Sequence, residues 1–302
     1  MKNQSQAYLL ALLAVLFWST IASAFKLTLR FLSFTELLLW ASLTSLGVFS
    51  IYLGFKGNLR SVFRHSRKQI FMAAVAGILN PFSYYLILLK AYELLPAQEA
   101  GTLNYFWPVI LVLLSIPLLH QKIKFSSIIG VVVSFSGIVM ISTHGNPASL
   151  HFSDPLGVAL ALTCPFIWAI YWIINMKNPM PDTEKLFIGF LTAFPLLFVV
   201  FILNGGTNHL PEWQGLAGSI YVGLFEMGIT FIVWLSALKK SQTTAHISNL
   251  IFLSPFLSLI YIHFLVGEEI LLSTIAGLAL IIAGIFLHHY GGRLYHFFRL
   301  RA

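Results

Sequence analysis

Residues 106–139 read FWPVILVLLSIPLLHQKIKFSSIIGVVVSFSGIV, and residues 253–286 read LSPFLSLIYIHFLVGEEILLSTIAGLALIIAGIF. With a shift of 147 positions, proline and glycine residues of the two stretches coincide: Pro108 with Pro255, Gly130 with Gly277, and Gly137 with Gly284. Shifts of 146 and 150 positions extend the match toward the N-terminus: Gly77 with Gly223, Ala91 with Ala237, and Trp18 with Trp168. Differences in loop length explain the small change in the shift. The ordered matches indicate an internal repeat of about half the chain.

The composition around this repeat is that of a membrane protein. The chain has 302 residues, of which 58% are hydrophobic and 9% are charged, whereas a soluble domain has roughly 25% charged residues. The single cysteine, Cys164, excludes a disulfide framework and a cysteine-based metal cluster. The net charge of +8 would suit nucleic acid, but the basic residues instead follow one side of a membrane. We therefore expect an integral membrane protein without a cofactor, metal, nucleic-acid partner or cleavable signal.

Apolar runs divide the chain into ten predicted transmembrane helices. A hydrocarbon core of about 30 Å requires about 20 apolar residues in a helix. Ten stretches meet this requirement: residues 8–29, 34–55, 70–92, 98–119, 125–143, 155–176, 184–204, 214–238, 243–265 and 271–290. The connections are short, and the longest runs only from Lys56 to Gln69. No connection has room for a soluble catalytic domain.

Basic residues assign a side of the membrane to each connection, because cytoplasmic loops carry an excess of lysine and arginine. If the N-terminus is cytoplasmic, 15 of the 18 basic residues fall in cytoplasmic segments. The outer side then keeps only Lys26, Arg30 and Lys90. Both termini are therefore predicted to be cytoplasmic.

The two halves must have opposite orientations in the membrane, because each contains five predicted helices and five is odd. We assign residues 1–145 to the first five-helix repeat and residues 146–302 to the second, inverted repeat. Inverted repeats recur in secondary transporters, where the substrate site lies near the bilayer midplane between the halves. The predicted fold is an all-α integral membrane protein with ten transmembrane helices in two inverted five-helix repeats around a central cavity.

Several short motifs resemble the drug/metabolite transporter superfamily and, within it, the EamA-like family. They are FWS at residues 17–19, NYFWP at residues 104–108, and LSPFLSLI, VGEEI and AGLALIIAG toward the C-terminus. The NYFWP stretch is similar to the corresponding segment of bacterial aromatic amino-acid exporters. The resemblance implies a bundle of ten helices around a central cavity that moves amino acids or other small metabolites, with efflux as the favoured direction.

One acidic residue lies deep in an apolar span. Glu226, within GLFEMGITFIVWL at residues 223–235, falls near the middle of the eighth predicted helix. An ionised carboxylate there costs about 2.5–3.5 kcal/mol on insertion scales. A water-filled cavity would offset this cost, whereas a protonated acid bonded to another helix would be structural. The repeat pairs Glu226 with Asn80, and two polar residues at matching depth favour a shared cavity.

Amide and hydroxyl groups of the third, fourth and ninth helices are further candidates. The predicted substrate-binding residues among them are Asn80, Tyr84, Asn104, Tyr105 and Asn249. Asn80 and Tyr84 are four residues apart and share a face of a regular helix. Trp107, in contrast, should point away toward packing or lipid. For every one of these polar groups the alternative is hydrogen bonding between helices.

Aromatic residues of the sixth helix form a stripe, because Trp168, Tyr171 and Trp172 share one helical face. Trp168 matches Trp18 across the repeat, and both lie away from the membrane interfaces where tryptophan normally gathers. We predict that these four residues line the cavity; the alternative is a packed or lipid-facing stripe. At the outer end of the first helix, Lys26 either extends to the lipid headgroups or pairs with Glu36 as a gate.

The predicted cavity has aromatic and amide groups, one acid and no mid-membrane lysine or arginine. Phosphorylated solutes require fixed positive charge and are disfavoured, whereas an ammonium group suits Glu226 and tryptophan faces. We therefore expect a secondary transporter in the bacterial inner membrane. It would move an amino acid or amine-like metabolite by alternating access, with efflux favoured and with Glu226 able to exchange a proton for the solute.

Other functions remain as alternatives. The first is an uptake carrier or exchanger of the same fold. A channel or structural membrane protein is less well supported, because the chain has no repeated selectivity loop and no continuous polar helix face. An intramembrane enzyme would need a catalytic constellation, but there is no HExxH motif and Cys164 has no histidine in its own span. The sequence leaves the oligomeric state open and is compatible with a monomer.

Overall fold

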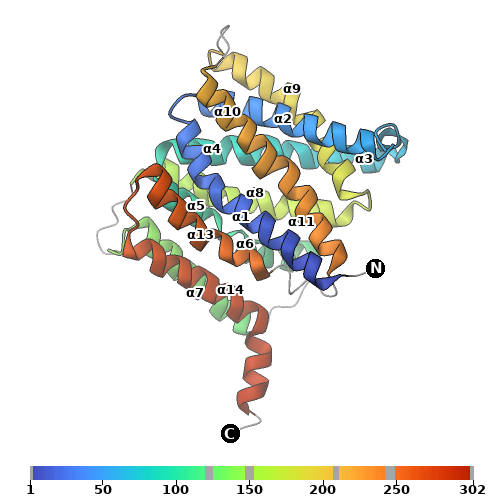
Figure 1. The fold of residues 1–302 in the computed structure, drawn as a ribbon. Coiled ribbons are helices and arrows are strands. Elements are labelled where there is room, and N and C mark those ends of the chain that lie inside the picture. The colour runs from blue at the N-terminus through green and yellow to red at the C-terminus, as the bar shows by residue number, and fades with distance from the viewer. Residues whose placement is uncertain (1–2, 120–124, 147–152, 207–210, 242–248, 300–302) are drawn as a thin grey trace.

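The computed structural model describes residues 3–119, 125–146, 153–206, 211–241 and 249–299, and every regular element in these ranges is a helix (Figure 1). In the first half the elements are α1 (Gln4–Thr28), α2 (Phe34–Phe55), η1 (Ser61–Arg64), α3 (Arg67–Gly77), η2 (Ile78–Ser83), α4 (Tyr84–Leu94), α5 (Ala97–Asn104), α6 (Trp107–Leu119) and α7 (Phe125–Ser142). In the second half they are α8 (Pro155–Lys177), α9 (Asp182–Leu203), α10 (Trp213–Val222), η3 (Gly223–Gly228), α11 (Ile229–Lys240), η4 (Asn249–Leu253), α13 (Ser254–Tyr261), η5 (Ile262–Val266) and α14 (Leu272–Arg299).

Short polar signals between the apolar runs determine where several helices begin. Ser66 and Gln69 form a capping box at the start of α3, which satisfies two backbone N–H groups that have no partner inside the helix. Asp154 accepts a 2.7 Å hydrogen bond from the N–H of Gly157, and Pro155 follows as the first residue of α8. Proline suits this position because its missing N–H would have no helical acceptor.

Six helices of the described part of the chain are long and apolar enough to cross a membrane. They are Gln4–Thr28, Phe34–Phe55, Arg67–Leu94, Pro155–Lys177, Asp182–Leu203 and Trp213–Lys240. Shorter apolar helices cover Ile129–Ile141, Leu250–Val266 and Leu272–Leu287. The all-helical class expected from the sequence is confirmed for these residues.

The fourth predicted helix is divided into α5 and α6, so the prediction of one helix over residues 98–119 is wrong. At the junction, the N–H of Tyr105 bonds to the carbonyl of Thr102 at 3.1 Å, and the N–H of Phe106 bonds to that of Leu103 at 3.2 Å. Each of these hydrogen bonds spans three residues, as in a tight turn, and not four, as in an α-helix. Pro108 then lacks the N–H that would continue the α-helical ladder. Side chains of the NYFWP motif therefore do not follow a single helical periodicity.

Two spans are interrupted by π-helical segments at corresponding places of the repeat. The segment η2 separates α3 from α4, and η3 separates α10 from α11. Within η2 the backbone of Asn80 is extended, with φ −147° and ψ 119°, and Pro81 supplies no N–H. Near η3 the backbone leaves the helical region at Gly228, with φ −110° and ψ −96°. Such π segments inside helices are frequent at functional sites.

The two halves pack in a reciprocal pattern. Helix α1 packs against α11, and α8 packs against α4; likewise α2 packs against η3, and α9 packs against η2. Helices α7 and α14 pack mainly against each other at one edge of the bundle (Figure 1). Close approach depends on glycine at one of these crossings, because a Cβ added to Gly77 would lie 2.5 Å from the Cα of Gly189.

Candidate functional site

A cavity of about 940 Å³ lies between the two halves of the chain. Its wall contains residues of α1, α4, α5 and α6 from the first half and of α8, η3, α11 and α13 from the second. This volume is at the upper end of the range of about 300–1,000 Å³ that is typical of small-molecule sites. The cavity therefore has room for an organic solute.

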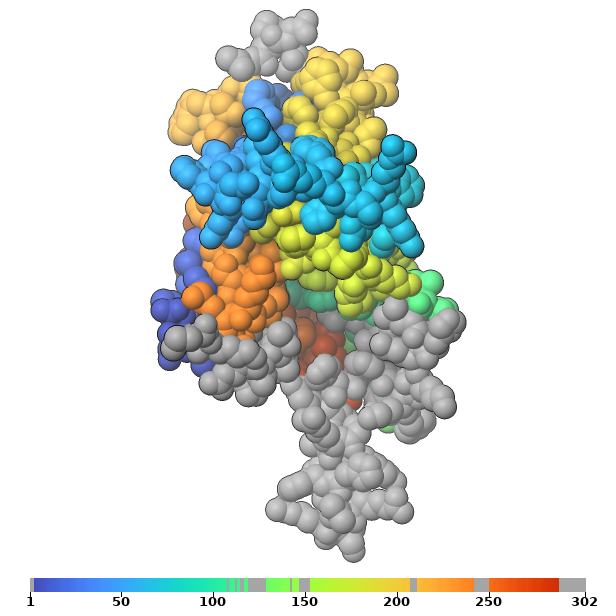
Figure 2. Space-filling view, turned by 90° about the vertical axis from the view of Figure 1, so that its right-hand side faces the viewer, coloured from blue at the N-terminus to red at the C-terminus, as the bar shows by residue number. Residues whose placement is uncertain are grey.

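The cavity reaches the surface at the C-terminal ends of α8 and α11. Met176 and Leu238 belong to its wall at these ends, and Met176 is 58% exposed. The N-terminus and the α2–α3 connection lie toward the same face of the bundle (Figure 1). Figure 2, which views this face, shows a recess between α11 and α8. The opening is thus on the face that carries most of the basic loop residues described.

Hydrogen bonds between the two halves of the chain close the opposite end of the cavity. Gln98, at the start of α5, donates from Nε2 to the carbonyl of Glu269 at 2.8 Å, and its Oε1 accepts from Thr274 Oγ1 at 3.0 Å. The carboxylate of Glu268 accepts from the backbone N–H of Ala97 at 2.7 Å and of Gln98 at 3.2 Å. A carboxylate at a helix N-terminus is a favourable cap. These contacts tie α5 of the first half to the η5–α14 connection of the second.

Lys26 belongs to this closed end, but it does not pair with Glu36. Its ammonium group donates to the carbonyls of Tyr92 at 2.7 Å and Leu95 at 2.6 Å, at the C-terminus of α4. A cation at the C-terminus of a helix satisfies free carbonyls and the helix dipole. Glu36 is buried in the first turn of α2. The structure therefore gives Lys26 a capping contact in place of the proposed gate pair.

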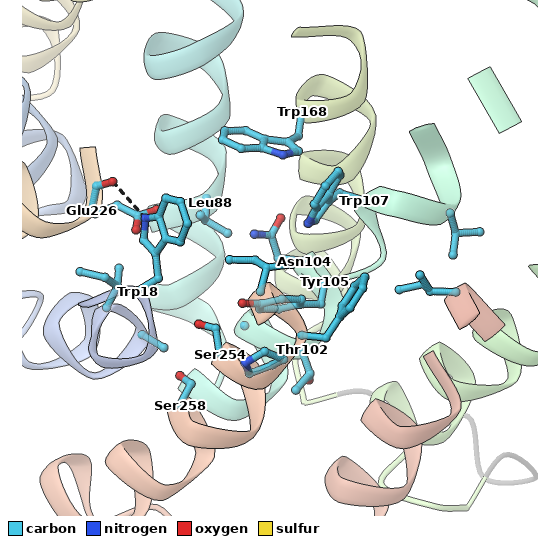
Figure 3. A pocket seen from close by; sticks show the side chains of 18 of the residues that line it. Trp18, Leu88, Thr102, Asn104, Tyr105, Trp107, Trp168, Glu226, Ser254 and Ser258 are labelled. Carbon is cyan, nitrogen blue, oxygen red and sulfur yellow. Dashed lines mark hydrogen bonds between the residues drawn. The ribbon is translucent and has the colours of Figure 1, made fainter. Parts of the chain in front are cut away.

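Glu226 lies in η3 at the cavity wall, and it is the only acidic or basic side chain among the described lining residues. Its Oε1 accepts a hydrogen bond from the Tyr85 hydroxyl at 2.9 Å. Its backbone carbonyl accepts from Trp18 Nε1 at 3.3 Å (Figure 3). The π-helical segment thus places a carboxylate of the second half against a tyrosine of the first.

The tryptophans at matching positions of the repeat stand on different sides of the cavity. Figure 3 shows Trp18 next to Glu226 and Trp168 across from them. Trp18 contacts Phe231 edge-on, with ring centroids 5.7 Å apart. Trp168 contacts Tyr84, with centroids 4.8 Å apart. These rings offer a cation both electron-rich faces and a large apolar area.

Polar groups of the cavity wall are only partly satisfied by the protein. Asn104 Nδ2 donates to the Tyr84 hydroxyl at 2.7 Å, and Tyr105 hydrogen-bonds Ser254. Two buried atoms of the wall, Asn104 Oδ1 and Trp172 Nε1, have no hydrogen-bond partner among the residues described. Buried polar atoms without a partner are unusual in native proteins. One acceptor and one donor are therefore free for a bound solute or water.

Three predicted site residues do not contribute described side chains to the cavity. Asn80 is 5% exposed and lies behind the wall, where it hydrogen-bonds Tyr171. Its extended backbone breaks the regular helix that the shared face with Tyr84 required. Tyr171 is also buried, with its ring 5.5 Å from that of Trp168. The side chain of Asn249 lies outside the described residues.

The structure adds residues that the sequence did not single out as site residues. The additional polar and aromatic residues of the cavity wall include Tyr92, Gln98, Thr102, Trp107, Trp234, Ser254 and Ser258. Trp107 lines the same cavity as Trp168, so the expectation that Trp107 points away is wrong (Figure 3). The turn between α5 and α6 changes its direction. Tyr85 is not part of the cavity wall but donates a hydrogen bond to Glu226. In the sequence, only its position directly after Tyr84 indicated that it lies near the site.

Comparisons with known proteins place the chain among transporters. The model of the EamA-like transporter family matches residues 5–143 and again residues 155–289. An uncharacterized transporter of Archaeoglobus fulgidus is 24% identical over 284 residues, which are 91% of this chain and 95% of the relative. The aromatic amino acid exporter YddG of Ancylobacter novellus is 26% identical over 242 residues, 80% of this chain and 82% of the relative.

A protein of known crystal structure has the same fold. It superposes with a TM-score of 0.65 at 25% sequence identity, and the match covers 94% of this chain and 96% of the other. The relatives are named as transporters, not as enzymes. Because the family model covers most of the chain in two successive matches, the chain belongs to the EamA-like transporter family and is a multi-pass membrane protein.

Proposed function

We propose that the chain is a secondary transporter of the bacterial inner membrane, with ten transmembrane helices in two inverted repeats and with both termini in the cytoplasm. The two family matches, at residues 5–143 and 155–289, support a division near residues 145 and 146. The reciprocal packing of the halves and the paired segments η2 and η3 are what two related five-helix units require. Loops rich in lysine and arginine support the orientation.

The proposed cargo is a small amphipathic solute with an ammonium group, such as an amino acid with an aromatic side chain. The observation that carries this proposal is that Glu226 is the single carboxylate among the described residues of the cavity wall, whose other described side chains are uncharged and in large part aromatic. A charge in a membrane protein interior marks a solute or proton path. The tryptophan faces of Trp18 and Trp168 suit both a cation and an aromatic ring. The name of the Ancylobacter relative agrees with this class of solute.

Glu226 can also exchange a proton for the solute. A carboxylate that binds an ammonium group when ionised releases it when protonated, so proton and solute compete for one site. The cavity opens on the basic-loop face and is closed at the other end by Gln98, Glu268 and Lys26. In the proposed orientation this is an inward-facing state, and alternating access requires these contacts to break. The favoured direction is efflux.

Counterflow in proteoliposomes tests the proposal. Vesicles loaded with unlabelled phenylalanine should accumulate labelled phenylalanine transiently, whereas a channel would only equilibrate it. N-acetylphenylalanine, which lacks the ammonium group, should compete about 10- to 100-fold less well than phenylalanine, because hydrogen bonds to charged groups contribute about 1.5–3 kcal/mol. Phenylethylamine keeps the ammonium group and should compete. Equal competition by the acetylated and free compounds would remove the basis for an ammonium site at Glu226.

Tyr85→Phe should weaken this solute binding without removing it. The substitution deletes the hydroxyl that donates to Glu226 Oε1 at 2.9 Å and keeps the buried ring. The carboxylate then loses one charge-assisted hydrogen bond and part of its positioning. We expect the concentration for half-maximal counterflow to rise about 3- to 30-fold, with folded yield unchanged. Tyr52 lies near the C-terminal end of α2 and is not part of the cavity wall. Tyr52→Phe therefore serves as the matched control and should leave counterflow unaltered.

A further inference from the structure

The cavity has an apolar branch that extends toward α7 and α14. The side chains that form this branch are Val109, Leu111, Val131, Phe252, Ile285 and Phe286. Gly130 and Gly284 complete its wall and contribute no side chain. The branch therefore has no described polar side chain, in contrast to the part of the cavity around Glu226 and Asn104.

The branch exists because α7 and α14 form a unit that stands away from the rest of the bundle. Glycines let the two backbones touch: a Cβ added to Gly277 would lie 2.7 Å from the carbonyl oxygen of Gly137. Apart from each other, the substantial contacts of the two helices are with α5. The cavity extends into the space in front of the pair, where described residues of α6 and η4 line it. Phe252 and Phe286 meet across it, with ring centroids 5.6 Å apart.

The chemistry of the branch restricts its occupant to hydrocarbon. Apolar cavities stay dry, because a water molecule needs two to four polar partners. An unfilled apolar space is also unfavourable, because its wall loses dispersion contacts. The branch is continuous with the carboxylate of Glu226, which attracts an ammonium group. A molecule that satisfies both parts has a cationic amine at one end and an apolar arm at the other.

We propose that this branch binds the hydrocarbon arm of the transported amine, so that the carrier accepts primary amines with extended alkyl chains and not only compact amino acids. The inference rests on the proposed function, because it takes the ammonium group to be at Glu226. The volume of about 940 Å³ supports it, since this is the upper end of the range for drug-sized ligands. Phe286, in the wall of the branch, is 39% exposed.

The test is a series of n-alkylammonium chlorides, from ethyl to octyl, titrated into the full-length protein in nanodiscs while tryptophan fluorescence is followed. Trp18 and Trp168 in the cavity wall make the emission sensitive to binding. The affinity should rise about fourfold per methylene until the branch is full, which is the gain expected from burying one methylene group. Binding of ethylammonium should be lost in Glu226→Gln.

Matched variants distinguish binding of the alkyl chain in the branch from partition of the alkylammonium ion into the bilayer. Val131→Phe fills the branch, whereas Val132→Phe adds the same group next to it on a side chain that is 60% exposed at the outside of α7. The ratio of octyl- to ethylammonium affinity should fall at least about tenfold in Val131→Phe and stay at the native value in Val132→Phe. Leu111→Phe, on the facing helix α6, should reduce the ratio as well and replaces Val131→Phe if that variant does not fold.

Other outcomes would overturn the inference. If ethylammonium binds in a Glu226-dependent way but the affinity does not grow with chain length, the branch does not hold the arm, while the proposed function stands. Equal ratios in the variants at positions 131, 111 and 132 would assign the chain-length effect to the lipid. A phospholipid that stays bound in native mass spectrometry when octylammonium is added would make the occupant an acyl chain. If no alkylammonium ion binds through Glu226, the proposed ammonium site fails too.

Discussion

Glu226→Gln should reduce counterflow of phenylalanine by about 10- to 100-fold and remove its dependence on pH. The amide has nearly the same size as the carboxylate and can still accept the hydrogen bond from Tyr85. It offers an ammonium group no opposite charge, and hydrogen bonds to charged groups contribute about 1.5–3 kcal/mol. It also cannot bind and release a proton. The measurement is the initial rate of counterflow at low solute concentration between about pH 6 and about pH 8, which is about one unit on either side of neutrality.

Glu212→Gln is the matched control for this variant. Glu212 precedes α10 on the same interrupted span and is exposed at its end, so the same change of charge occurs outside the cavity. Its counterflow should equal that of the native chain. Folded yield and monodispersity should be unchanged in both variants, because the amide introduces no steric conflict. Native rates with native pH dependence in Glu226→Gln would show that this acid only connects helices.

Gly77→Ala should destabilise the folded protein strongly despite the small size of the change. Gly77 has helical dihedral angles, φ −63° and ψ −35°, so alanine at this position would be favoured by helix propensity. Its Cβ would, however, lie 2.5 Å from both the Cα and the carbonyl oxygen of Gly189. Backbone atoms of α9 cannot move aside as a side chain can. Overpacking of this kind costs about 1–3 kcal/mol, and we expect Tm in detergent to fall by about 5 °C or more.

Gly47→Ala provides the comparison that isolates this contact. Gly47 lies in α2, and a Cβ added there would meet no atom within 4 Å. The same substitution should therefore leave Tm unchanged or raise it slightly, since glycine in a helix is about 0.5–1 kcal/mol less favourable than alanine. An equal Tm for the two variants would mean that α3 and α9 are not in backbone contact next to η2. Their packing would then not hold the interrupted span in place.

The positions of the helices could be predicted because the signal for them is local. Runs of apolar residues of sufficient length and the polar caps between them lie within a few residues of each helix end, as at Ser66 and Asp154. Glu226 could be identified as a cavity residue for a related reason. A carboxylate in an apolar helix is costly wherever the helix faces lipid, so its presence alone points to a polar environment.

The directions of individual side chains could not be predicted in the same way. Asn80 and Tyr84 share a face only if the helix between them is regular, but the extended backbone of Asn80 interrupts it. Trp107 lies after a turn that divides the fourth span, so helical spacing from Asn104 does not apply to it. Tyr85 became important only through its contact with Glu226, 141 residues away. None of these features leaves a periodic trace in the sequence.

By itself, then, the sequence determined the helical class, the places of the long apolar helices and one carboxylate in an apolar run. These follow from the transfer of apolar and charged groups out of water, which depends on each residue and its near neighbours. Only the tertiary structure decided which end of the cavity is closed, which rings face Glu226 and where the apolar branch runs. These depend on helix breaks and on backbone contacts between distant residues such as Gly77 and Gly189. Close packing makes such contacts specific to one arrangement of the whole chain.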